Sequence, residues 1–175
     1  MTYKEPYPIF LTATILYWNQ LLKDDAMKDI ILKSLKFLSD TGRLKVFGLV
    51  VMPNHIHLIW QISPELKPDH VQRDFLRYTA QQFKFRLLDM KAPDLKRYYV
   101  GAKDREYQFW ERNAWHVNML GESMLRQKLR YIHKNPLQER WRLVDRKEEY
   151  LYSSANFYQT GMQDFGFLKH YRTIR

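Results

Sequence analysis

The chain has 175 residues, of which 45% are hydrophobic and 15% aromatic, enough for one packed domain and too much for a disordered chain. Lys and Arg total 29 against 19 Asp and Glu, and the net charge of +10 favours a polyanionic partner, either nucleic acid or an anionic membrane surface. The absence of cysteine excludes a disulfide scaffold, a cysteine-based zinc site and a thiol nucleophile.

The N-terminal sequence carries an acid and two prolines before any apolar run, which is unlike a secretory signal. The longest apolar run, about Val46–Met52, is far too short to cross a membrane. We therefore expect a cytoplasmic protein with no membrane partner. A single domain is expected over residues 1–160, followed by a C-terminal tail over 161–175.

The first half of the chain predicts a strand, a helix and a hairpin. Pro8–Tyr17 is rich in β-branched and aromatic residues, which favour strands. A helix is expected next, capped by Asp24 or Asp25, because apolar residues recur there at helical spacing. Leu44–Met52 and His55–Ile62 flank a Pro-Asn turn and predict two paired, buried strands.

The second half predicts two more helices with an extended segment between them. Pro68–Met90 is expected to be a long helix and Tyr107–Leu120 to be extended. Glu122–Lys134 predicts a helix that ends at Asn135, because the following proline disfavours helical geometry in the residue before it. The resulting order indicates an α+β fold, with a ferredoxin-like antiparallel sheet and helices packed on one face.

His55 and His57 are the first candidate site. Side chains alternate across a strand, so both imidazoles should lie on the same face of the sheet. Two such imidazoles can chelate one metal ion, and added oxygen ligands would suit Mg²⁺ or Mn²⁺. Two histidines that only pack or form hydrogen bonds on a half-buried strand would give the same pattern.

Tyr131 and Asn135 are the second candidate site. Residues four apart lie above one another on a helix, so the two should share a face near its C-terminal end. Their phenol and amide groups could meet a metal held by the histidines, with Tyr131 as nucleophile and Asn135 as a third ligand. The chain has 12 tyrosines, so packing is the alternative for Tyr131, and Asn135 could simply terminate the helix.

Basic residues surround this second site, with eight Lys or Arg against three Asp or Glu between Gly121 and Lys147. Such side chains can neutralise phosphates, and the rings of two nearby tryptophans, Trp110 and Trp115, can stack on unpaired bases. The candidate nucleic-acid-binding residues are Arg112, Arg126, Lys128, Arg130, Lys134 and Trp110. A solvated helix face is the alternative for the charges, and core packing is expected for at least one of the two tryptophans.

Five motifs occur in order between about Leu44 and Tyr158: MPNHIHLIW, RDFLRYTAQQF, FWERNAW, YIHKNP and YLYSSANFY. Together they resemble the HUH single-tyrosine transposases, and within them the REP-associated tyrosine transposases. The resemblance implies that His55, His57 and Asn135 bind a divalent metal ion, Mg²⁺ or Mn²⁺, and that Tyr131 is the nucleophile.

The same resemblance implies a DNA transposase or endonuclease that cleaves and rejoins single-stranded DNA through a 5′-phosphotyrosine intermediate. The expected partner is single-stranded DNA with a hairpin, and the chain would act as a monomer or a homodimer. Two other functions stay open: a catalytically inactive nucleic-acid-binding module of the same fold, and an unrelated small metallohydrolase that uses His55 and His57.

Overall fold

The computed structural model describes residues 6–174, so the first five residues of the predicted domain and the last residue of the predicted tail lie outside the described part. The strands are β1 (Ile9–Thr14), β2 (Leu44–Val51), β3 (His55–Ile62), β4 (Tyr99–Ala102), β5 (Arg105–Tyr107) and β6 (Trp115–Asn118). The α-helices are α1 (Asp25–Asp40), α2 (Pro68–Asp89), α3 (Glu122–Lys134) and α4 (Ala155–Thr160).

Four strands form one antiparallel sheet in the order β2-β3-β1-β6. The first and third strands therefore lie side by side at the centre, as in the split β-α-β arrangement, and the predicted α+β class is confirmed. The predicted hairpin is the β2–β3 pair. In the β1–β3 register, Thr12 lies opposite His57 and Thr14 opposite His55.

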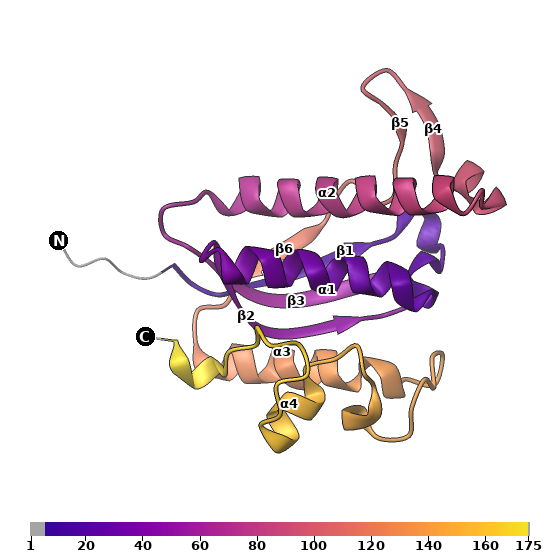
Figure 1. Cartoon of the computed structure of the whole chain (residues 1–175). Helices are drawn as coiled ribbons and strands as arrows, with labels where there is room; N and C mark the ends of the chain where they lie inside the picture. Colours follow the sequence, from indigo (N-terminus) through magenta and orange to yellow (C-terminus); the bar gives the residue numbers. More distant parts are fainter. Residues whose placement is uncertain (1–5, 175) are drawn as a thin grey trace.

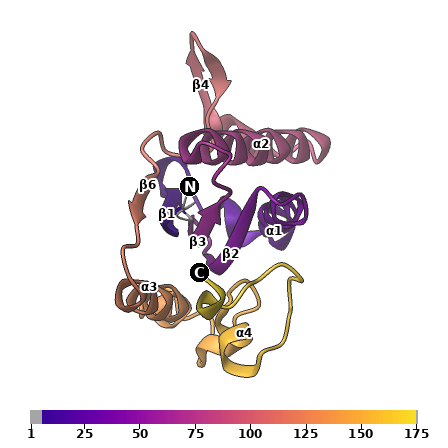
Figure 2. The ribbon, with the colours of Figure 1, turned by 90° about the vertical axis from the view of Figure 1, so that its left-hand side faces the viewer.

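Both faces of the sheet are covered by helices (Figures 1 and 2). α1 and α2 share one face, and α3 lies on the other. The expectation of helices on one face therefore holds for α1 and α2 but not for α3. The physical reason is that β2 is apolar on both sides, so Phe47 and Val50 on its second face can bury another amphipathic helix.

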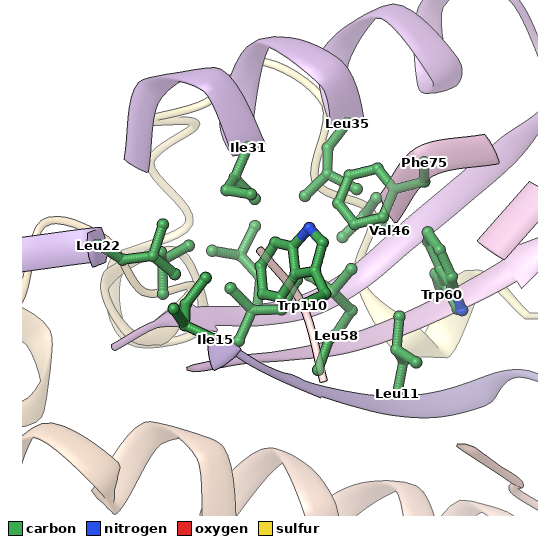
Figure 3. Close-up of a cluster of buried hydrophobic side chains, with 14 of the residues drawn as sticks. Leu11, Ile15, Leu22, Ile31, Leu35, Val46, Leu58, Trp60, Phe75 and Trp110 are labelled. Atoms are coloured by element: carbon green, nitrogen blue, oxygen red, sulfur yellow. The ribbon is translucent and has the colours of Figure 1, made fainter. Parts of the chain in front are cut away.

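The larger core lies between the sheet and the α1–α2 pair (Figure 3). Leu58 and Trp60 of β3 point into it and meet Ile31 from α1 and Phe75 from α2. Alternation then sends the odd-numbered residues of β3, including both histidines, toward α3. The pleat of one strand thus separates packing residues from candidate site residues.

Gly48 of β2 lets α3 lie close to the sheet. A Cβ atom at this position would lie 2.6 Å from Leu129 Cδ2 and 3.2 Å from Ile132 Cδ1, closer than ordinary van der Waals contact. Leu129, Ile132 and Leu125 of α3 are buried against the sheet. This packing sets the height and rotation of the helix that carries Tyr131.

The predicted extended segment Tyr107–Leu120 is extended only in part. β5 pairs with β4 in a separate hairpin that projects beyond α2 (Figure 2), and β6 follows after an irregular stretch. Near the C-terminus, Leu168 is buried and forms a parallel bridge with Val46 at the outer edge of β2. Within residues 6–174, no helix is long and apolar enough to span a membrane.

Two segment ends differ from their predicted geometry. β1 stops at Thr14, and the chain turns through a 3₁₀ helix, Leu16–Trp18, instead of staying extended to Tyr17. At the other end of the site, α3 stops at Lys134 as predicted, but Asn135 keeps helical angles (φ −53°, ψ −47°). Asn135 therefore stays in helical register with Tyr131 despite the proline that follows it.

Candidate active site

His55 and His57 lie side by side on the α3 face of β3. Both are buried, and their ring centroids are 4.8 Å apart. His57 sits between β1 and β2, where Thr12 and Val50 are its neighbours across the two ladders. The predicted shared face is therefore observed, and the imidazoles stand on a strand that is paired on both sides.

Each imidazole is oriented by a hydrogen bond at Nδ1. Asn54 Oδ1 lies 2.7 Å from His55 Nδ1, and Thr12 Oγ1 lies 2.8 Å from His57 Nδ1. An amide oxygen can only accept, so His55 carries its proton on Nδ1, and the Thr12 hydroxyl can accept from His57 in the same way. Both Nε2 lone pairs then remain available to a ligand.

Neither Asn54 nor Thr12 is among the predicted site residues. Asn54 directly precedes His55, so its adjacency is a signal that the sequence contains. Thr12 reaches His57 only through the pairing of β1 with β3, and the sequence shows no such pairing directly.

Burial keeps both histidines neutral. It lowers the pKa of His55 to about 4; the Asn135 side chain, which would accept a hydrogen bond from the protonated ring, opposes this shift, and the positive charge of Arg140 adds to it. It lowers the pKa of His57 to about 3, with further contributions from His55 and from the ammonium of Lys128. Near neutral pH both rings are therefore in the form that binds metal ions.

Tyr131 of α3 faces this histidine pair. Its ring centroid lies 5.3 Å from that of His57, and the residue is 45% exposed, so the phenol is accessible from solvent. Lys128 Nζ lies 5.7 Å from the Tyr131 ring centroid and also over the rings of Phe10 and Trp115. A phenol, two imidazoles and an ammonium group thus converge from one helix and one sheet of the same chain.

Asn135, at the C-terminal end of α3, is the last member of the candidate site. Its Nδ2 donates to the carbonyl oxygen of Tyr131 at 3.2 Å, while its buried Oδ1 has no hydrogen-bond partner. The Asn135 side chain lies close enough to His55 to raise the pKa of that ring, because it would accept a hydrogen bond from the protonated form. A buried amide oxygen without a donor is costly, and a cation held by His55 and His57 would satisfy it.

The donor set therefore fits a divalent ion bound by two imidazoles and one amide oxygen. Among residues 6–174 there is no group of three or more His, Cys, Asp or Glu that could hold a metal. The candidate site is compatible with that finding, because it contains only two residues of these types, His55 and His57, and its third ligand is an asparagine.

The predicted nucleic-acid-binding residues differ in how exposed their side chains are. The side chains of Arg112, Arg126, Arg130 and Lys134 are exposed, and Arg126 Nη1 lies 3.7 Å from Glu122 Oε1. Lys128 is partly buried among the rings described above.

Trp110 does not fit the predicted stacking role. It is only 6% exposed, and its Nε1 donates to Thr79 Oγ1 of α2 at 3.0 Å. Its ring packs against Phe83 in the larger core, so neither face is open to a base. Trp115 is 52% exposed on β6, and its ring lies beside Phe10 and Lys128 on the face that carries the site.

Residues 9–135 match the sequence model of a protein family described as "Transposase IS200 like". The chain belongs to the IS200-like transposase family. The matched range includes both histidines, Tyr131 and Asn135. No curated protein matches the sequence.

Two solved structures resemble this family member. A structure of "the REP associates tyrosine transposase bound to a REP hairpin" has a TM-score of 0.63 at 17% sequence identity and covers 97% of this chain and 89% of that one. A proposed transposase from Deinococcus radiodurans R1 has a TM-score of 0.49 at 20% identity, covering 77% and 94%. At these identities the first match supports the fold.

Proposed function

We propose that this IS200-like transposase cleaves and rejoins single-stranded DNA through a covalent 5′-phosphotyrosine link at Tyr131. The observation that carries the proposal is the position of the exposed Tyr131 phenol, ring to ring 5.3 Å from an imidazole whose Nε2 is free. His55 completes the imidazole pair at 4.8 Å.

His55, His57 and Asn135 would hold a divalent metal ion, Mg²⁺ or Mn²⁺. The unpartnered Asn135 Oδ1 and the two neutral imidazoles support this set of ligands. When bound, the ion would polarise the scissile phosphate and neutralise the charge that develops on it.

The reaction exchanges one phosphate ester for another. Tyr131 Oη attacks the phosphorus, an Oη–P bond forms, and the P–O3′ bond breaks. The departing 3′ oxygen gains a proton as Tyr131 loses one, so the products are a 5′-phosphotyrosine and a free 3′-OH. Because the link conserves the ester, attack by another 3′-OH reverses the step and rejoins the strand without ATP.

The surroundings of Tyr131 suit a polyanionic strand. The ammonium of Lys128 lies beside the phenol and would attract a phosphodiester, and Arg130 and Lys134 extend the basic surface along α3. A DNA hairpin as partner is supported by the hairpin bound to the solved structure of the same fold. One copy of the chain contains all four proposed site residues, so a monomer could act alone.

The decisive experiment compares Tyr131→Phe with Tyr99→Phe, a matched change at an exposed tyrosine on the distant β4. Each protein is incubated with labelled single-stranded oligonucleotides that contain hairpins, with Mn²⁺ or with EDTA. We expect cleavage and a denaturation-resistant protein–DNA adduct with wild type and Tyr99→Phe in Mn²⁺ only. Tyr131→Phe should bind DNA but form neither product.

The failures of this experiment are informative. Cleavage by Tyr131→Phe at near wild-type rate would exclude Tyr131 as the nucleophile and favour a metallohydrolase that uses the histidines. Binding by the wild type without cleavage of any substrate would favour a catalytically inactive nucleic-acid-binding module.

A further inference from the structure

Two adjacent aromatic residues stand in solvent at the end of β1. Tyr17 is 69% exposed and Trp18 62% exposed. Within residues 6–174 neither ring stacks on another ring or lies under a cationic side chain. Most other large aromatic side chains near this end of the sheet are packed in a core or against the histidines.

Both residues lie in a turn with a strained backbone. Both residues have left-handed angles, with φ of 55° at Tyr17 and 58° at Trp18, which L-residues with side chains rarely adopt. The turn is held by Tyr17 N–H donating to Glu111 Oε1 at 2.7 Å and Trp18 N–H donating to Ile15 O at 2.9 Å. These hydrogen bonds account for the turn, but the two large rings contribute nothing to the core while they are held in it.

The turn is connected to the candidate active site through one side chain. Asn54 Nδ2 donates to the carbonyl oxygen of Trp18 at 3.5 Å, and Asn54 Oδ1 accepts from His55 Nδ1 at 2.7 Å. The main chain adds a second connection, because Ile15 N–H donates to Asn54 O at 2.8 Å. The two exposed rings therefore lie at the His55 end of the sheet.

We infer that Tyr17 and Trp18 form a stacking platform for unpaired bases of the DNA strand that leads to Tyr131. The inference rests on the proposed function for the identity of the strand. Aromatic faces accept bases of any sequence, and the exposed guanidinium of Arg112, next to Glu111 in the chain, is available for a phosphate. The chain's net charge of +10 favours this polyanion over an acidic or neutral protein surface as the occupant.

The test measures binding without cleavage. Tyr17→Gly and Trp18→Gly are made in a Tyr131→Phe background, and fluorescence anisotropy gives the Kd for oligothymidine, which has no hairpin. Loss of one stacked ring should weaken binding about 5- to 150-fold. Tyr99→Ala, which removes an exposed ring from β4, should bind like the parent.

Glycine separates a binding role from a structural one. It adopts positive φ without strain, so both glycine variants should melt at or above the parent's temperature. Unchanged Kd values in both variants, or a clear fall in melting temperature that accounts for weaker binding, would overturn the platform. Photo-cross-linking of an oligonucleotide with 5-iodouracil should label the peptide that contains Tyr17 and Trp18, and labelling elsewhere only would also overturn it.

These results can be told apart from failure of the proposed function. If no DNA is cleaved by wild type yet the glycine variants lose oligothymidine binding, the platform stands and the nuclease assignment falls. If Tyr131-dependent cleavage is observed and both glycine variants bind normally, only the platform falls.

Discussion

Acid should destabilise this protein well above the pH at which its carboxylates titrate, because three of its imidazoles are buried and neutral. Burial lowers the pKa of His55 to about 4 and that of His57 to about 3. The third imidazole is His133 of α3, whose Nε2 lies 2.8 Å from Ser154 Oγ and whose pKa burial lowers to about 3. The usual value for all three is 6.5.

Acid lowers the free energy of unfolding because the unfolded chain binds more protons than the folded chain. Below pH 6.5 the unfolded chain takes up protons on these rings while the folded chain does not, so the stability present above pH 6.5 is lost as the pH falls toward 4 and then 3. Between pH 7 and 5 each ring costs about 2 kcal/mol, or about 6 kcal/mol for the three. That is a large part of a typical free energy of unfolding of about 5–15 kcal/mol.

The measurement is urea unfolding in EDTA at pH 7 and pH 5, followed by tryptophan fluorescence. We expect His133→Gln to reduce the loss between the two pH values to about 4 kcal/mol, because one titrating ring is gone. His116→Gln, at an exposed position on β6, serves as the matched control and should leave the loss unchanged. A wild-type loss below about 2 kcal/mol, or equal losses in the two variants, would refute the reasoning.

Three further predictions concern the metal site. Mn²⁺ at about 100 times its Kd should stabilise the protein by about 2.7 kcal/mol, which corresponds to a rise in melting temperature of roughly 5–10 °C. The variant His57→Ala should show no such rise, and a similar rise in that variant would place the ion elsewhere. Since the folded pKa values of His55 and His57 are about 4 and 3, Mn²⁺ affinity measured by calorimetry should change little between pH 7 and 5. Thr12→Val removes the oxygen beside His57 Nδ1 and should weaken Mn²⁺ binding about 10- to 100-fold, whereas an unchanged affinity would mean that Thr12 does not orient the ring.

The sequence predicts those parts of the site that local periodicity determines. Strand alternation correctly puts His55 and His57 on one face, and helical spacing correctly puts Asn135 near Tyr131. The sequence alone could not predict which residues orient the imidazole rings, because Thr12 meets His57 only across the β1–β3 ladder. Long-range packing also decides between the two tryptophans.

Trp110 and Trp115 illustrate that limit. Both lie in a segment that looks uniformly extended, and either ring could stack on a base. In the fold, Trp115 lies opposite Thr12 on the face that carries the site, whereas Trp110 is anchored by Thr79 of α2. The distinction depends on a partner 31 residues away along the chain, which no local pattern contains.

The end of β1 shows local preference giving way to long-range hydrogen bonds. The β-branched and aromatic run favours an extended chain as far as Tyr17, and no glycine signals a left-handed turn there. Yet Ile15 N–H donates to Asn54 O and Leu16 N–H to Phe109 O, each at 2.8 Å, and these bonds draw the chain out of the sheet. A segment whose structure opposes its own sequence preference, with two rings left in solvent at the end of the sheet that carries His55, is where a binding role is expected. This physical conflict, more than the exposure of the rings alone, is the reason to test Tyr17 and Trp18 before other surface aromatic residues.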